Sequence, residues 1–399
     1  MSVEFDQKIH TTLADANLQL AIYTATGRLK EKRIEAVSDA WLPDYQELRT
    51  QANAIKKHAI ENLDHYLEEF ERNVEARGGK VIYCKDATEV SDFVLSLAKE
   101  RGSRLIVKSK SMTTEEVDLN ERLEHHGLES VETDLGEYIL QLAHEKPYHI
   151  VAPALHKTRY DVAEIFTREL HVANETVPEK QTVIAREVLR EKFLHADIGI
   201  SGANFLVADS GAVTLIENEG NARLTTSAPR IHIAVAGIEK VIPRAQDLAV
   251  FLKLLARSAT GQLLSVYTSF LSGARRPGEV DGPEEFYVVL LDNGRRLVRR
   301  QDARRGKDHR APAEQGRTRP RGLRAPRFLL TVSSLAQERH RHRAGTFAVL
   351  LGGQQNGVKG MRAVLTWAAA FQADWRADIS GVSSPAIALA TEGADTSGG

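Results

Sequence analysis

Apolar positions in the first three quarters of the chain switch between a helical spacing and short continuous runs. From residue 48 to residue 74 they recur at intervals of three, four and seven, which predicts one face of a long helix. Gly78 and Gly79 follow and are expected to end this helix, because glycine accepts the left-handed conformation of a helix C-cap. The apolar positions are Leu48, Ile55, Ala59, Leu63, Leu67, Phe70 and Val74.

Strand and helix signals then alternate as far as residue 152. An alternation of short apolar runs with amphipathic segments is typical of an α/β fold, with a mostly parallel sheet that helices cover on both faces. The expected strands are residues 81–83, 105–107, 128–132 and 149–152, and the expected helices are residues 90–97, 114–125 and 136–145.

The pattern becomes mixed beyond residue 152. Two β-rich runs, residues 205–208 and 213–216, are separated by Asp209-Ser210-Gly211, which is a hairpin turn signal. The sheet is therefore expected to include some antiparallel pairing. Further elements are expected at residues 183–194 and 248–255, as helices, and at residues 231–236, as a strand.

Composition divides the chain near Gly294. Of its 399 residues, 53 are Lys or Arg and 54 are Asp or Glu, but 19 of the basic side chains and only 8 of the acidic ones lie in residues 295–399. The apolar periodicity also stops there. We therefore divide the chain into a helical extension at residues 1–78, an α/β domain at residues 79–294 and a basic tail of low order at residues 295–399.

Composition also argues against several classes of protein. No run of about 18 apolar residues is present, which disfavours a membrane span, and residues 1–10 lack the apolar run of a signal peptide. Cys84 is the only cysteine, so the chain contains no internal disulfide and no multi-cysteine metal site. Phosphate-binding glycine loops, the zinc-protease motif, the nucleophile elbow and metal-like histidine spacings are absent. We expect a cytoplasmic protein without a metal site.

Four residues follow the expected strand at residues 105–107 and precede a helix. Open α/β sheets often bind ligands at the carboxyl ends of their strands, and lysines, serines and helix amides together favour an anion. Thr113 and Glu116 have the spacing of a capping box. A capped helix after a solvated loop explains the same pattern, so both interpretations stay open. The candidate anion-binding residues are Lys108, Ser109, Lys110 and Ser111.

Acidic side chains follow the next expected strand. Glu132, Asp134 and Glu137 lie within six residues of one another. Such carboxylates repel unless they are solvated, hydrogen-bonded or face a cation, and Glu132 and Asp134 are therefore candidate binding residues. Acids at the start of a helix, which the helix dipole favours, are an equal explanation.

Two loops in the second half of the α/β region are the richest in polar side chains. Glu217 and Glu219 lie two residues apart and share a face if the strand continues, so they are candidates for a base, a nucleophile or an orienting pair. A β-turn explains this loop equally well. His232 is a third catalytic candidate, although a histidine satisfied within the sheet fits slightly better. The candidate binding residues are Asn204, Asn218, Gly220, Asn221 and Arg223.

These segments together resemble the lactate utilization protein B family, whose members are iron–sulfur subunits of a three-part L-lactate oxidation system. The matching segments stand in the family's order and cover about three quarters of the chain, to Gly294. They are KSKSMTTEE from Lys108, ETDLGEYILQ from Glu132, GISGANF from Gly199, NEGNAR from Asn218, HIAVAGIEK from His232, RSATGQ from Arg257 and GEVDGPEEFYVVLLDNG from Gly278.

The resemblance implies a LUD domain, whose fold is similar to that of ribose-phosphate isomerases and CoA transferases. It also implies oxidation of lactate to pyruvate with partner subunits, and 4Fe–4S clusters in a C-terminal ferredoxin-like module. Past Arg295 this chain has no cysteine, so it departs from the family and lacks the thiolate ligands. Two other functions fit the same residues: an independent isomerase or CoA-transferase-like enzyme for an anionic small molecule, and a non-catalytic assembly subunit.

The resemblance and the ordinary composition are lost at the same place, near Arg295. Out-of-frame codons of GC-rich DNA encode Arg, Ala, Pro and Gly, so we expect that residues 295–399 result from a reading-frame slip and replace an iron–sulfur module. Translation of the source DNA in the other two forward frames should restore a cysteine-rich sequence. If neither frame does so, the tail is a genuine basic arm of the kind that binds nucleic acid through phosphates; otherwise no nucleic-acid partner is expected.

Overall fold

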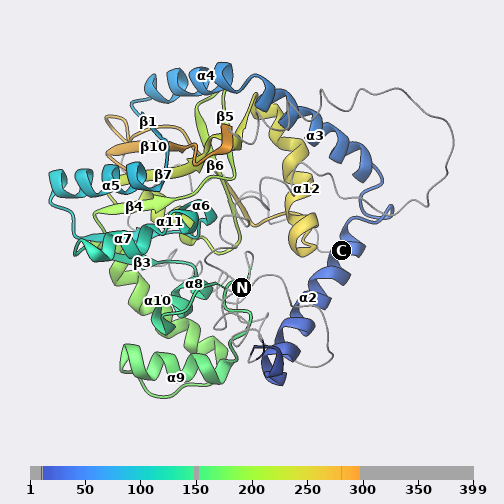
Figure 1. Cartoon of the computed structure of the whole chain (residues 1–399), viewed down its shortest axis with the longest axis vertical. Helices are drawn as coiled ribbons and strands as arrows, with labels where there is room; N and C mark the ends of the chain where they lie inside the picture. Colours follow the sequence, from blue (N-terminus) through green and yellow to red (C-terminus); the bar gives the residue numbers. More distant parts are fainter. Residues whose placement is uncertain (1–9, 11, 148–151, 280, 297–399) are drawn as a thin grey trace, which may run out of the picture.

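The computed structural model describes residues 10, 12–147, 152–279 and 281–296, and its centre is a six-stranded sheet (Figure 1). All neighbouring strands of this sheet run parallel, which confirms the expected mostly parallel arrangement. In spatial order the strands are β1 (Lys80–Cys84), β10 (Glu285–Leu291), β7 (Ile231–Gly237), β4 (Ile198–Ser201), β2 (Leu105–Lys108) and β3 (Glu129–Glu132).

Side chains alternate across this sheet, so its central strands contribute to two cores. On β7, Ile231 and Ile233 belong to one core, while Ala234 and Ala236 belong to the core on the opposite face. Strands that are buried on both faces are nearly continuous apolar runs, and β10 with its sequence EFYVVLL is such a strand. β10 and β7, which are neighbours inside the sheet, are therefore rich in apolar residues along most of their length.

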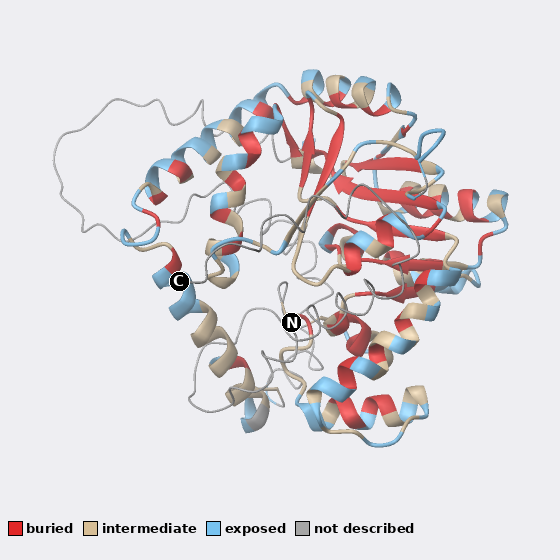
Figure 2. Ribbon diagram, turned by 180° about the vertical axis from the view of Figure 1, so that it is seen from behind, coloured by how far each residue is buried: buried red, intermediate tan, exposed pale blue. Residues whose placement is uncertain are grey.

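Helices cover both faces of the sheet, and Figure 2 shows the strands as mostly buried. The face of Ile231 and Ile233 packs against α5 (Ala87–Arg101) and α7 (Leu119–His125). The opposite face packs against α4 (Leu63–Glu75), α8 (Leu135–Ala143), α9 (Arg159–Leu170) and α10 (Pro178–His195).

A second, four-stranded sheet contains the antiparallel pairing. β5 (Phe205–Val207) and β6 (Ala212–Glu217) form the expected hairpin, with Gly211 at a φ of 65° in the turn. β6 also pairs antiparallel with β9 (Tyr267–Leu271), and β5 pairs parallel with β8 (Val241–Ile242). The antiparallel strands thus form a separate layer, and β7 stays in the parallel sheet.

The N-terminal helices pack onto this body. α2 (Ala16–Ala36) and α3 (Tyr45–Glu61) lie beside α12 (Leu248–Thr260), where Tyr45 and Leu48 share a core with Leu254. Two short 3₁₀ helices, at Ile238–Lys240 and Ala245–Asp247, connect β7 to α12.

The single long helix expected from residue 48 to residue 74 is wrong, because α3 and α4 are separate helices. Asn62 lies between them with a φ of −116° and a ψ of 35°. Its side-chain Nδ2 donates to the carbonyl of His58 at 2.9 Å, and such local side-chain bonds compete with the helix. The apolar spacing continues across the break because Ala59 and Leu63 enter the same core.

The helix expected at residues 114–125 is also divided, into α6 (Met112–Glu116) and α7. Asp118 adopts a φ of 49° between the two helices, which a continuous helix does not allow. The expected capping box is wrong as well. The cap is Ser111, whose Oγ accepts from the amide of Thr114 at 3.3 Å, while Glu116 turns toward Arg295.

Other expectations fall on residues that the structure does not describe. Residues 148–151 include most of the strand expected at 149–152, and residues 297–399 make up nearly all of the basic tail. Among the helices in the described ranges, none has both the length and the apolar character needed to cross a membrane.

Arg101 and Glu285 form a bidentate ion pair between α5 and β10. Nε and Nη2 of Arg101 lie 2.7 and 2.9 Å from the carboxylate oxygens. These bonds, aided by the hydroxyl of Tyr287, lower the pKa of Glu285 to about 2. A carboxyl whose pKa is lowered by folding stabilises the protein above its unfolded pKa of about 4.3, and this stabilisation is lost as the pH falls toward 2.

We expect Arg101→Met to lower the free energy of unfolding at neutral pH, because it removes both hydrogen bonds to the carboxylate of Glu285. The difference from wild type should shrink between about pH 5 and pH 2, as measured by urea unfolding at a series of pH values. Arg168→Met, which breaks an exposed pair with Glu169, is the control and should show little change. A difference that persists undiminished at low pH would contradict this assignment.

Candidate functional site

Lys108 and Glu132 lie side by side at the carboxyl ends of β2 and β3. The two residues are direct partners in the parallel pairing of these strands. Nζ of Lys108 lies 2.6 Å from Oε1 of Glu132, and the side chains are only 0% and 4% exposed. Because a buried charge needs a compensating partner, this ion pair is the centre of the candidate site.

Two further groups from α6 surround the ammonium of Lys108. Nζ lies 3.0 Å from Oγ1 of Thr114 and 3.2 Å from Oε1 of Glu115. Burial lowers the pKa of Lys108, but the carboxylates of Glu132 and Glu115 outweigh that effect and raise it. An ammonium has three donors, and these three partners use them all. An incoming anion would therefore meet Lys110 rather than Lys108.

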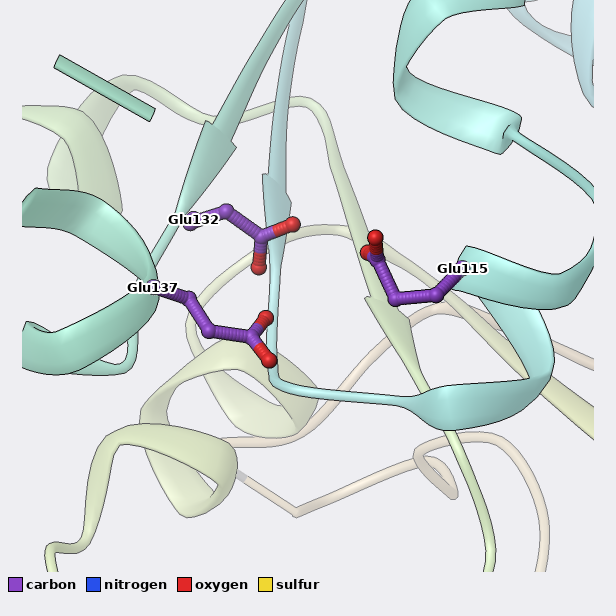
Figure 3. Close-up of side chains that lie close together, drawn as sticks. All are labelled: Glu115, Glu132 and Glu137. Atoms are coloured by element: carbon purple, nitrogen blue, oxygen red, sulfur yellow. The ribbon is translucent and has the colours of Figure 1, made fainter. Parts of the chain in front are cut away.

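Glu115, Glu132 and Glu137 lie close together beside Lys108, with their carboxylates turned toward one another (Figure 3). One carboxylate oxygen from each lies within 4.8 Å of the others. Burial, and then the charge of Glu132, raises the pKa of Glu137 to about 9. Burial likewise raises the pKa of Glu132, although Lys108 opposes this. The three carboxyl groups of the cluster thus face a single ammonium group, that of Lys108.

A second charged group, formed by Lys110, Asp134 and Glu219, lies beside the first. Asp134 caps α8, where its Oδ1 accepts from the amide of Glu137 at 3.1 Å. Burial, followed by the charge of Asp134, raises the pKa of Glu219 well above its ordinary value, and Lys110 opposes the shift. Oε2 of Glu219 is buried and has no hydrogen-bond partner among the described residues. This oxygen therefore remains available for a ligand, while the carboxyl group also accepts from the amide of Leu135.

Glu217 does not share a continuing strand face with Glu219, because β6 ends at Glu217. Its two oxygens accept from the amides of Ala222 and Arg223, each at 2.9 Å, at the start of α11 (Asn221–Ser227). Gly220 makes this turn with a φ of 80°. Burial raises the pKa of Glu217 in spite of the two amide bonds. Both oxygens hold the loop in place, so Glu217 positions α11.

Asn204 and Asn218 fasten the polar loops to the second sheet. Oδ1 of Asn204 accepts from the amide of Ile216 at 2.8 Å. Asn218 donates to Oε1 of Gln262 and accepts from the amide of Val266, both at 3.0 Å. Their polar atoms therefore maintain the loop structure around Glu217.

Asn221 and Arg223 lie on α11 and face different surroundings. Asn221 is buried and its Nδ2 donates to Oγ1 of Thr133 at 3.3 Å, which ties α11 to the loop after β3. The guanidinium of Arg223 is exposed and lies over the ring of Tyr267, 4.9 Å from its centroid. Of the two, Asn221 lies closer in the fold to the acidic groups around Asp134.

Ser109 and Ser111 hold the loop after β2 against β4. The amide of Ser109 donates to the carbonyl of Ile200 at 2.9 Å, and both serines are buried. Gly202 packs so closely on Ser111 that a Cβ atom would lie 2.8 Å from its Oγ. Glycine is needed at position 202 for this close approach.

His232 lies within β7, away from the charged groups. Its Nε2 is 2.9 Å from Oγ of Ser201, and its ring packs on Phe286 at a centroid distance of 5.2 Å. Complete burial lowers the pKa of His232 to about 3, so the ring is neutral. Within the described ranges no interaction joins His232 to Glu217 or Glu219.

Thr114, Glu115 and Asn120 belong to the site but were not among the residues singled out from the sequence, and Glu137 was noted there only as one of three clustered acids. Asn120 donates to Oε1 of Glu132 at 2.6 Å. A sequence pattern could have indicated Glu115 and Glu137 as site residues. Each is an acidic residue in the first turn of a helix, and that helix follows a strand that ends in Lys108 or Glu132.

A second ion network fastens the end of β10 to the same edge of the sheet. Arg295, whose side chain is 14% exposed, lies 2.8 Å from Oε2 of Glu116 and 2.5 Å from Oε2 of Glu239. Nδ2 of Asn293 also donates to Glu116 at 2.5 Å. The part of the chain that packs onto the α/β domain therefore extends to Arg295.

The iron–sulfur clusters that the family resemblance implies do not fit this chain. A 4Fe–4S cluster is held by four cysteine thiolates, and the sequence has one cysteine. Cys84 lies buried in the core beneath α5, and burial raises the pKa of its thiol to about 11. The thiol is neutral and enclosed by apolar side chains, which is the opposite of a metal ligand's environment.

We expect Lys108→Met to destabilise the protein by about 3–5 kcal/mol, because it leaves the buried Glu132 without its counter-charge. The double variant Lys108→Met/Glu132→Gln should recover part of this loss. Lys192→Met is the control, since it breaks a more exposed pair with Glu129 and should cost less than about 1 kcal/mol. Urea unfolding followed by circular dichroism measures all three, and equal costs for the two single variants would show that the Lys108 pair is unimportant.

Curated relatives with similar sequences share one name. A protein of Bacillus licheniformis named Lactate utilization protein B is 45% identical over 293 residues, which are 73% of this chain and 61% of that protein. Proteins of the same name from Anoxybacillus flavithermus and Bacillus subtilis are 43% and 44% identical and are covered to 62% and 60%. The chain thus spans about three fifths of the length of these relatives.

A solved structure and a family were also matched. The crystal structure of a DUF162 family protein from Deinococcus radiodurans aligns with a TM-score of 0.32 at 13% identity, over 57% of this chain and 98% of that one. The family model of the LUD domain matches residues 67–291, which are more than half of the chain and include both charged groups of the site. This chain belongs to the LUD domain family.

Proposed function

We propose that this chain takes part in lactate utilization, as the LUD-domain component of a cytoplasmic system that oxidises L-lactate to pyruvate with partner subunits. The observation that carries the proposal is the 42–45% identity to proteins named Lactate utilization protein B, over 73–74% of the chain. The shared region contains the charged groups at the carboxyl ends of β2 and β3.

The electron-transfer part of this activity is assigned to another polypeptide. One buried cysteine does not hold a 4Fe–4S cluster, so the chain contributes binding and orientation. A cluster held elsewhere would accept the electrons released from lactate.

Lys110 and Glu219 are the residues that suit a small hydroxy acid. Lys110 has no carboxylate within ion-pair distance among the described residues and supplies the charge that a substrate carboxylate needs. Glu219 retains a buried oxygen without a partner, which suits a hydrogen bond to the substrate hydroxyl. Glu217 and Asn221 hold the loop that presents Glu219.

A second candidate is an independent enzyme of the isomerase or CoA-transferase kind that acts on an anionic small molecule. The same unpartnered oxygen of Glu219, on a carboxyl group beside Lys110, favours it. A non-catalytic assembly subunit, by contrast, requires no free carboxyl group at this position. The effect of Glu219→Gln on function therefore separates a chemical role from assembly.

We expect a chimera to support growth on L-lactate. It joins residues 1–295 of this chain to the C-terminal part of the Bacillus subtilis relative and replaces that relative in its own host. Glu219→Gln should reduce growth on L-lactate at least tenfold without lowering the amount of protein, because it removes the acid group but keeps the shape of the side chain. Growth rates and immunoblots of the chimeras measure the two effects.

Glu124→Gln is the matched control, because Glu124 is exposed on α7 and no hydrogen bond or ion pair of this side chain contributes to the site. An expressed chimera that fails to support growth would refute the lactate proposal. Normal growth with Glu219→Gln would instead leave this chain with an assembly role only.

A further inference from the structure

The cluster of Glu115, Glu132 and Glu137 is built from three elements that are separate in the sequence. Glu115 comes from α6, Glu132 from the end of β3 and Glu137 from the first turn of α8. Figure 3 shows the three carboxylates turned toward one another, and one oxygen of each lies within 4.8 Å of the others. Such a distance allows one small cation to contact all three.

Two oxygens of this cluster have no partner. Oε1 of Glu132 already accepts from Lys108 and Asn120, but Oε2 of Glu132 is buried and accepts from nothing in the described part of the chain. Oε1 of Glu137 is likewise buried and has no hydrogen-bond partner among the described residues, and Glu137 is only 4% exposed. Buried carboxylate oxygens without partners are costly, which points to a ligand that the chain itself does not supply.

Charge balance indicates the class of ligand. With a cation bound, three ionised carboxylates and the one ammonium of Lys108 together carry a net charge of about −2, which a divalent cation cancels. The available ligand atoms are carboxylate oxygens, which hard cations such as Mg²⁺ and Mn²⁺ prefer. Lys108 contacts Glu132 and Glu115 through their Oε1 atoms, so the other oxygens remain for the cation.

We propose that Glu115, Glu132 and Glu137 bind one Mg²⁺- or Mn²⁺-type divalent cation, and that Lys108 and Asn120 orient the ligands through their contacts with Oε1 of Glu132. Glu115 has a side chain that is 32% exposed and lies on the solvent side of the cluster. The cation enters past Glu115 and is held by the two buried carboxylates. This site is independent of the lactate proposal.

The experiment titrates the full chain with Mn²⁺ and measures free Mn²⁺ by electron paramagnetic resonance. We expect one Mn²⁺ per chain, displaced by Mg²⁺, and an affinity at least tenfold lower in Glu137→Gln. Glu115→Gln is a second variant with the same expectation, and its more exposed position makes it tolerant of substitution. Glu124→Gln, exposed on α7, is the matched control and should bind as wild type does.

Thermal unfolding with and without Mn²⁺ supplies a readout that does not depend on activity. A cation that binds only the folded protein raises the Tm of the wild type and of Glu124→Gln, but not that of the two cluster variants. Absence of Mn²⁺ binding by the wild type at millimolar concentration overturns the proposal. Binding that Glu137→Gln and Glu115→Gln leave undiminished overturns it as well, because the cation then lies elsewhere.

Discussion

An ammonium group buried at the end of a parallel strand must exchange all its water for protein partners, and Lys108 sets this constraint on the fold. Removing such a charge from water costs several kcal/mol unless hydrogen-bonded counter-charges replace the solvent. The direct pairing of Lys108 with Glu132 provides this compensation only in the observed register of β2 and β3. A shift of one residue would turn Glu132 to the opposite face of the sheet and leave the ammonium uncompensated.

The loop from Glu132 to Glu137 connects the two charged groups. Glu132 and Glu137 face Lys108, whereas Asp134, between them in the sequence, raises the pKa of Glu219 in the second group and also acts on Glu137. The cap to α8 holds the Asp134 carboxylate against the backbone amide of Glu137. A ligand that changes the charge of one group therefore changes the electrostatic potential at the other.

Much of the fold could be predicted because its strands are short apolar runs between amphipathic helices. The breaks at Asn62 and Asp118 could not, since the apolar spacing continues through both while a single residue leaves the helical conformation. β10 was not predicted as an element, although its sequence EFYVVLL is mostly apolar after Glu285. Its insertion between β1 and β7 depends on pairing over long sequence distances, which local periodicity does not contain.

The site could be located but not assembled from the sequence. The ends of β2 and β3 identified Lys108 and Glu132, because carboxyl ends of parallel strands meet at one edge. The short distance in sequence between Glu217 and Glu219 suggested that the two act as a pair. In the structure Glu217 binds the first amides of α11, whereas Glu219 interacts with Lys110 and Asp134. Chemical type alone suggested that Lys108 binds an anionic ligand, and only its neighbours show that protein carboxylates already surround its ammonium. In a buried polar site, the function of a charged residue follows from which of its hydrogen bonds the protein leaves open.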